Sequence, residues 1–156
     1  MAEFLSSFNF EVVISPSGHG GDEGITRSAA FSEISGLEQT LEMVTLREGG
    51  YNEGVRQLAG KASHAQLVLK RGVTADRAFW QWVQRCMHGP YPLPYVSGEV
   101  RVFAPAGDRE TPQARWSFVN AIVTRVRSSD LQAGNASNVP IEELHLAHEG
   151  LQREVP

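Results

Sequence analysis

The sequence predicts a mainly β protein: a small antiparallel β-barrel or sandwich with one flanking α-helix, at about residues 74–88, and a long extended loop, at about 46–60. Several short segments alternate apolar and polar residues, as strands with one buried face do. One segment instead repeats apolar residues at helical spacing. The chain has 156 residues, 41% of them hydrophobic, which predicts a single domain over 1–156.

The first half of the chain shows the clearest alternation. In the stretch FNFEVVI, at 8–14, Phe8, Phe10, Val12 and Ile14 fall on one face of a predicted strand. Glycine-rich turns interrupt the pattern further along. The other strands expected in this half lie at 29–46, as two short strands or one strand bent near Gly36, and at 63–71, where Ala65, Leu67 and Leu69 share a face.

The predicted helix has recognisable start and stop signals. Thr74 is a suitable N-cap, and Gly89 followed by Pro90 ends the segment. Between them, apolar residues recur every three or four positions, as on the buried side of an amphipathic helix. The residues expected on or beside this stripe are Phe79, Trp82, Val83, Cys86 and Met87.

The second half is predicted to be mostly strand. Alternation indicates strands at 99–104 and at 114–128. The segment 139–151 is ambiguous, because its apolar residues suit either a helix or one face of a strand. On the strand at 114–128, the residues expected to share a buried face are Trp116, Phe118, Ile122, Thr124 and Val126.

Charge and cysteine content narrow the class of protein. Lys and Arg number 14 against 18 Asp and Glu, a net charge of −4, which argues against a nucleic-acid-binding face. The single cysteine, Cys86, has no partner for an internal disulfide. The first residues have no basic segment followed by an apolar core, and no apolar run is long enough to span a membrane. We therefore expect a protein made and folded in the cytoplasm, without a membrane anchor.

The residue types that carry chemistry do not form a convincing site. His145 and His148 are three apart, which suits a metal site on a helix but places them on opposite faces of a strand. Ser17 and His19 are merely neighbours in a glycine-rich loop, which lacks the spacing of a nucleophile or a phosphate loop. Cys86 belongs to the apolar stripe of the helix. We expect no enzyme activity, no catalytic residue, no cofactor and no metal.

Five stretches in fixed order carry a resemblance. The resemblance covers roughly residues 8–151, and its strength lies in the order and intervals of these stretches. The chain resembles the tail tube proteins of contractile phages and of phage-derived extracellular contractile injection systems. Small departures are LAG, where Pro-Gly is common, and LREGG, where Tyr or Phe often precedes the Arg. The stretches are FSEISGL (31–37), LREGGYNE (46–53), LAGKASHAQLVLKRGVTAD (58–76), W-x-F-x-N-A (116–121) and IEELHLAHEGL (141–151).

The resemblance implies a structural subunit rather than an enzyme. In that family a β-barrel subunit with a flanking helix assembles into hexameric rings, and the rings stack into a tube whose lumen passes cargo or DNA. The implied partners are other copies of the chain, a sheath protein, a baseplate or hub, and tape-measure or cap proteins. The implied location is a phage tail or an extracellular injection particle.

Three alternatives remain open at this point. One is a paralogue that initiates the tube at the baseplate and joins it to the hub. Another is a secreted binding module or effector carrier, as type VI tube proteins can be. The third is a small hydrolase on a β-barrel, for which the sequence offers no nucleophile.

The polar stretch at 46–60 fits the tube hypothesis best. It is charged and rich in glycine, and it shows no period that would bury it in a core. Such a segment suits an arm that leaves the subunit and is fixed by a neighbouring copy. The predicted inter-subunit assembly residues are Arg47, Glu48, Gly49, Gly50, Tyr51, Asn52, Glu53 and Arg56.

Overall fold

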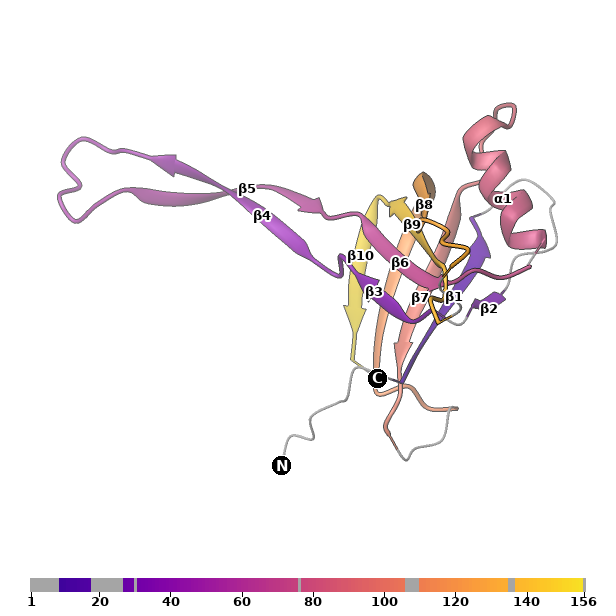
Figure 1. Cartoon of the computed structure of the whole chain (residues 1–156). Coiled ribbons are helices and arrows are strands. Elements are labelled where there is room, and N and C mark those ends of the chain that lie inside the picture. The colour runs from indigo at the N-terminus through magenta and orange to yellow at the C-terminus, as the bar shows by residue number, and fades with distance from the viewer. Residues whose placement is uncertain are drawn as a thin grey trace.

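A computed structural model describes residues 9–17, 27–29, 31–75, 77–105, 110–134 and 137–155. Over these residues the chain forms ten strands and one helix, which confirms the mainly β prediction (Figure 1). The elements are β1 (Phe10–Pro16), β2 (Arg27–Ala29), β3 (Glu33–Ser35), β4 (Gln39–Leu46), β5 (Arg56–His64), β6 (Leu67–Gly72), α1 (Arg77–His88), β7 (Val96–Val102), β8 (Ala114–Ser128), β9 (Ile141–Ala147) and β10 (Gly150–Glu154).

Eight of the strands form two antiparallel layers that share one long strand. The first part of β8 pairs with β7 and with β10, and β7 continues to β1 and β2. The second part of β8 pairs with β9, and β9 continues to β6 and β3. The described strands do not close into a barrel, so the sandwich is the architecture that fits. The segment 139–151, which was ambiguous, is β9 and the start of β10.

β8 changes layer at Asn120, which has a left-handed backbone with φ of 49°. Before this corner the buried side chains include Phe118, and after it Ala121 and Val123. The corner shifts the alternation by one residue. The prediction that Thr124 continues the buried face is therefore wrong, and Thr124 is exposed.

The core lies between the two layers and under the helix. Both strand layers and α1 contribute to one continuous apolar cluster. Its most buried members include Val12, Val96, Val100 and Phe118 from one layer, Leu67, Leu69 and Leu146 from the other, and Trp82 and Val83 from the helix.

The helix is slightly shorter than predicted and buries a different stripe. α1 begins at Arg77 rather than at 74. Its buried residues are spaced i, i+3, i+4 and i+7 from Phe79, so position 87 lies about 90° from the middle of the stripe. Met87 is accordingly 38% exposed, and its predicted burial is wrong. Trp82 donates its indole N–H to the carbonyl oxygen of Pro94 at 3.1 Å, which ties the helix to the connector that follows it.

A buried ion pair joins two strands beneath the helix. Arg71 of β6 and Glu142 of β9 are direct register partners, with Nε to Oε2 at 3.2 Å and side chains only 6% and 7% exposed. The Arg71 guanidinium carbon also lies 3.8 Å from the ring centroid of Phe79 in α1. Removing either partner would leave a buried charge without its counter-charge, which is costly.

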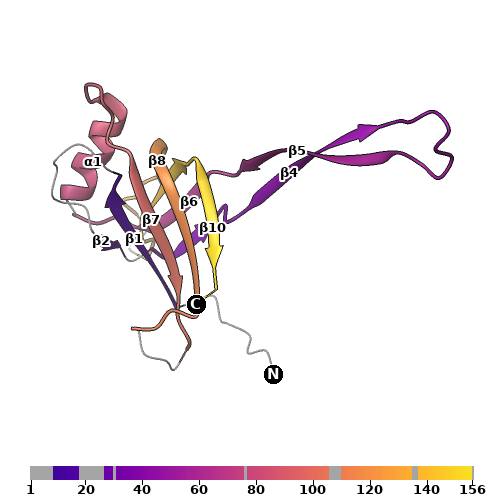
Figure 2. The ribbon, with the colours of Figure 1, turned by 180° about the vertical axis from the view of Figure 1, so that it is seen from behind.

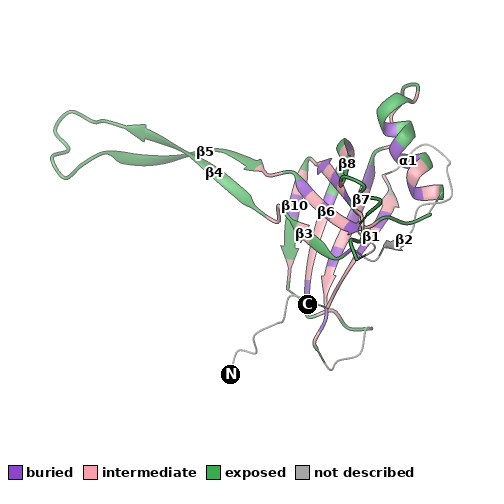
Figure 3. Cartoon of the chain, viewed as in Figure 1, coloured by how far each residue is buried: buried purple, intermediate pink, exposed green. Residues whose placement is uncertain are grey.

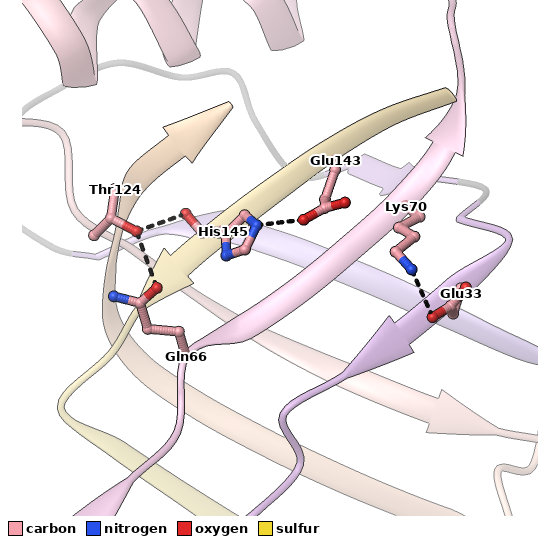
Figure 4. Close-up of polar contacts among 6 residues, drawn as sticks. All are labelled: Glu33, Gln66, Lys70, Thr124, Glu143 and His145. Carbon is pink, nitrogen blue, oxygen red and sulfur yellow. Dashed lines mark hydrogen bonds and ion pairs between the residues drawn. The ribbon is translucent and has the colours of Figure 1, made fainter. Parts of the chain in front are cut away.

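The outer face of the β3–β6–β9 layer carries further polar pairs (Figure 4). Lys70 contacts Glu33 across the β3–β6 pair at 3.0 Å. On β9, His145 and Glu143 lie 2.6 Å apart, Nε2 to Oε1, and this hydrogen bond holds the pKa of the Glu143 carboxyl below its usual value. These contacts belong to a solvated sheet face.

The remaining two strands leave the body. β4 and β5 form a hairpin that projects far from the sandwich, on the side away from α1 (Figures 1 and 2). The predicted loop at 46–60 was too long, since Leu46 ends β4 and β5 already begins at Arg56. A register shift between Leu41 and Met43, opposite Gly60, breaks the alternation that would have indicated β5.

No helix among the described residues is both long and apolar enough to cross a membrane.

Candidate assembly arm

We call residues 39–64 the arm: strands β4 and β5 and the connection at 47–55 between them. Every residue of β4 is exposed, and in β5 only His64 is partly buried (Figure 3). The two strands pack mainly on each other. A two-stranded hairpin alone is marginally stable in water. Nearly the whole length of the arm is therefore free to contact a further surface.

The arm presents apolar side chains on both of its faces. Cross-strand partners share a face, which pairs Leu41 with Ala62 on one side and Val44 with Leu58 on the other. A hairpin that packs on its own body needs only one apolar face. The large apolar side chains of the arm's strands, each exposed to between 42% and 51%, are Leu41, Met43, Val44, Leu46 and Leu58.

The arm carries no net formal charge. It has equal numbers of acidic and basic residues, so the −4 of the whole chain lies in the rest of the sequence. Identical arms therefore do not repel each other through net charge, and a neutral apolar ribbon is suited to lie against another copy. The charged residues of the arm are Glu42, Glu48, Glu53, Arg47, Arg56 and Lys61.

The connection folds around a small cluster at the far end of the arm. Arg56 donates from Nε to Glu48 at 2.9 Å, and its guanidinium carbon lies 4.9 Å from the ring centroid of Tyr51. The backbone N–H of Tyr51 donates to the carbonyl oxygen of Glu48 at 3.3 Å. Gly50 and Gly54 have φ of 96° and 139°, which other residues rarely adopt. The cluster is exposed, so its ion pair adds little stability.

The structure thus places all eight predicted assembly residues in the connection or at its junction with β5. It brings Glu48, Tyr51 and Arg56 together within one chain. Among the predicted residues, Arg47 and Glu53 have no ion-pair partner in the described part of the chain. The remaining predicted residues, Gly49, Gly50 and Asn52, are exposed around the same bend.

The root of the arm, where it joins the body, contains Gly36, where the sequence predicted a break or bend, and Gln39, which the sequence did not single out. Gly36 has φ of 88°, and a Cβ there would collide with the carbonyl group of Gln66. The side-chain amide of Gln39 donates to the carbonyl oxygen of Leu151 in β10. The glycine and the amide together set the place where β4 departs from the sandwich.

Two histidines meet at this root. His64 ends β5, and His148 follows β9. Their ring centroids are 5.4 Å apart, and the Nε2 atom of His148 lies 3.0 Å from the carbonyl oxygen of Ala65. His148 was weighed as a metal ligand with His145, but the two histidines engage different partners, since His145 pairs with Glu143. The sequence contained one hint of this meeting: His64, in SHAQ, and His148, in LAHEG, both stand at the ends of strands.

Burial lowers the pKa of His148 from its usual 6.5. The carbonyl group of Ala65 acts in the opposite direction, the neighbouring His64 lowers the pKa further, and the carbonyl group of Gly150 raises it. Burial also raises the pKa of the Cys86 thiol. Cys86 is thus buried and unreactive in character, as predicted from its place in the helix stripe.

Comparison with known proteins gives this architecture a family. Residues 6–152 match the family described as T4-like virus tail tube protein gp19. The chain belongs to the tail tube family. Among curated protein sequences, none matches closely enough to count as a relative.

Solved structures agree with the tail tube assignment. The chain is 26% identical to a chain in the cryo-EM structure of the anti-feeding prophage baseplate, with a TM-score of 0.82 over 99% of this chain and 98% of that one. It is 18% identical to a chain of the PVC extracellular contractile injection system, sheath–tube complex in the extended state, with a TM-score of 0.77 over 97% and 92%. An Hcp protein shares the fold at 12% identity, with a TM-score of 0.60 over 94% and 92%.

The matching family is described as a tail tube protein, and one of these neighbours lies in a sheath–tube complex. The chain is accordingly a structural component of a phage tail or of a phage tail-like injection particle.

Proposed function

We propose that this tail tube protein is the subunit of the inner tube of a contractile tail or injection system, and that it assembles into stacked hexameric rings around a lumen that passes cargo or DNA. The observation that carries the proposal is the arm. Its two exposed apolar faces favour a covering surface, and its lack of net charge does not oppose contact with an identical arm. An identical subunit supplies such a surface in a closed ring or a stack.

The eight assembly residues take a definite role in this proposal. Arg47 and Glu53 form ion pairs with a neighbouring copy, while Glu48, Tyr51 and Arg56 keep the end of the arm in the shape that the neighbour receives. Gly49, Gly50 and Asn52 allow the bend. A sheath protein outside the tube, and a hub, tape-measure and cap proteins at its ends, complete the set of partners. We place the synthesis of the subunit in the cytoplasm.

The proposal is tested by placing a charge on either face of the arm. Met43→Glu and Val44→Glu alter opposite faces, and both side chains are already half exposed, so the isolated subunit should fold normally. In a tube each would bury an unpaired carboxylate, which is costly. We expect the yield of intact particles to fall by more than about tenfold in cells that produce the variant in place of the natural chain, counted by negative-stain microscopy.

Leu131→Glu is the matched control, because Leu131 is an apolar residue of the body that is 81% exposed. Its particle yield should equal that of the natural chain. Normal tubes with both arm variants would show that the arm is not a contact between subunits, and the proposed role of the arm would then be wrong.

A second candidate function is a tube segment next to the baseplate, which joins the tube to the hub. One observation favours it: identity and TM-score are higher for the chain in the baseplate structure than for the chain in the sheath–tube complex. Gold-labelled antibody against the chain distinguishes the two functions. Label along the whole particle indicates the main tube subunit, and label confined to one end indicates the baseplate segment.

A further inference from the structure

We propose that the root of the arm is an acid-sensitive hinge, in which the neutral rings of His64 and His148 hold the arm against the body and their protonation releases it. The hinge is distinct from the assembly contacts proposed above, because it acts within one chain.

The two rings belong to the two parts that the hinge would separate. His64 is the last residue of β5 and so belongs to the arm, whereas His148 lies in the short link between β9 and β10 of the body. Their centroids are 5.4 Å apart with the planes tilted by 40°, which is direct ring contact. The ring of Phe118 lies behind His148 at 6.4 Å, so the contact is backed by the core of the sandwich.

Hydrogen bonding fixes where an added proton would go. A carbonyl oxygen only accepts, so the contact between Nε2 of His148 and the oxygen of Ala65 requires the proton of the neutral ring to be on Nε2. Protonation then adds a hydrogen at Nδ1. This atom is buried without a hydrogen-bond partner in the described part of the chain, and so is Nδ1 of His64. A buried donor without an acceptor is strongly unfavourable. At His148 the carbonyl group of Gly150, which raises the pKa of the ring, offsets part of this cost.

The groups around the pair do not neutralise its charge. From β4 the neighbour is the amide of Gln39, from β8 the ring of Phe118, and from β10 the backbone. Two carboxylates lie close by in sequence and are otherwise engaged: Glu149 accepts from Asn120 at 2.8 Å, and Glu38 accepts from Thr40 at 3.4 Å. The charge that acts on His148 is that of His64, which is of the same sign when protonated.

Few other contacts hold the arm in place. Within the described residues, three hydrogen bonds tie the root to the body: from Gln39 to Leu151, from His148 to Ala65, and from the Thr124 hydroxyl to the side-chain oxygen of Gln66. The arm's strands pack mainly on each other. Charging both rings would set like charges in contact and add buried N–H groups, and at His148 the carbonyl group of Gly150 only partly offsets this cost. The balance at the root would therefore shift toward release.

The hinge is tested on the full chain by measuring the distance between arm and body. Spin labels at Glu53→Cys, in the connection, and Gln152→Cys, on the exposed part of β10, report the arm's direction by pulsed electron resonance. Cys86 is buried and stays unlabelled, which mass spectrometry verifies. We expect one narrow distance distribution at about pH 8 and a broadened one at about pH 5, with unchanged circular dichroism of the body.

Variants assign the change to the two rings. His148→Gln keeps a side-chain N–H for Ala65 but cannot take up a proton, and His64→Phe keeps the ring contact without titrating. In each, the broadening at low pH should fall to less than about half of that in the natural chain. His88→Gln, at the exposed end of α1, is the matched control and should respond like the natural chain.

The proposal is overturned by either of two results. The first is a distance distribution of the natural chain that does not change between the two pH values, or that changes only as the body unfolds. The second is a full acid response in a folded His148→Gln or His64→Phe variant. Neither result depends on whether tubes form, so the hinge and the proposed tube function can fail independently.

Discussion

Asn120 shows how one residue determines the path of the longest strand. Its φ of 49° lies in the left-handed region, which Asn tolerates better than most residues do. Its side-chain amide donates to Glu149 at 2.8 Å and so connects the corner of β8 with the link between β9 and β10. Asn120 is the N of the W-x-F-x-N-A stretch, which therefore marks the corner of the sandwich.

Asn120→Ala and Asn120→Gly separate the backbone contribution from the side chain. Both variants lose the hydrogen bond to Glu149, but only glycine adopts positive φ without strain. We expect Asn120→Ala to have a free energy of unfolding lower than that of Asn120→Gly by about 1 kcal/mol, measured by urea denaturation. Equal stabilities would mean that the corner relaxes to ordinary strand geometry.

The sequence pattern contained a sign of the buried pair Arg71–Glu142, but the pair was not predicted. Alternation places Arg71 on the same face as Leu67 and Leu69, and Glu142 on the same face as Leu144. Charged residues are rarely buried, so the pattern alone favours a solvated position. Only the strand pairing of β6 with β9 shows that the two charges meet. A single sequence does not show which side chains from distant segments come into contact.

Strands and helices were predicted correctly where the apolar pattern of their own residues was regular. The strand predicted at 114–128 has the bounds of β8, because apolar alternation runs through both of its ends. The region 29–46 resolves into β3 and β4, divided at Gly36 as one of the two alternatives had it. The start of β5 was missed, since Gly60 and the register shift remove the period there and every side chain is exposed.

Shortening the arm tests its connection as an element. Replacing residues 47–55 with Asn-Gly joins Leu46 directly to its ladder partner Arg56 through a two-residue turn. Since the removed residues are exposed, the free energy of unfolding should change by less than about 0.5 kcal/mol. Negative-stain microscopy should show that particle formation is lost.

Loss of cooperative unfolding in this shortened chain would show that the connection belongs to the core. Normal tubes, in contrast, would show that only the strands of the arm serve assembly. The sequence predicted that these eight residues lie on one segment that leaves the body, and the structure places seven of them in the connection and Arg56 at the start of β5. Their division into an internal cluster and two unpaired charges came from the structure.

For the whole molecule, the fold could be predicted from the sequence more completely than the root of the arm could. Alternation, one amphipathic segment and five ordered stretches were enough for the class and the family, because these signals extend over the whole chain. The root of the arm depends on Gln39, His64 and His148, which come from three separate segments. No local spacing connects them.

The stability of the whole chain should depend on pH through His148. Its pKa is lowered from the usual 6.5 in the folded chain, so the unfolded chain takes up a proton at a higher pH than the folded one does. The contribution is fully present above about pH 6.5, decreases as the pH falls toward the folded pKa, and then levels off. In urea denaturation, His148→Gln should therefore lose less stability than the natural chain between about pH 7.5 and 5.5. An identical loss in both proteins would contradict the assignment to His148.

The sharing of β8 between the two layers has a mechanical meaning. In a sandwich of separate sheets, a push on one sheet reaches the other only through side-chain contacts, which can slide. Here the backbone of β8 runs unbroken from the β7–β10 side to the β9–β6 side. A force that enters one layer is carried to the other along covalent bonds, and the two layers move as one stiff body.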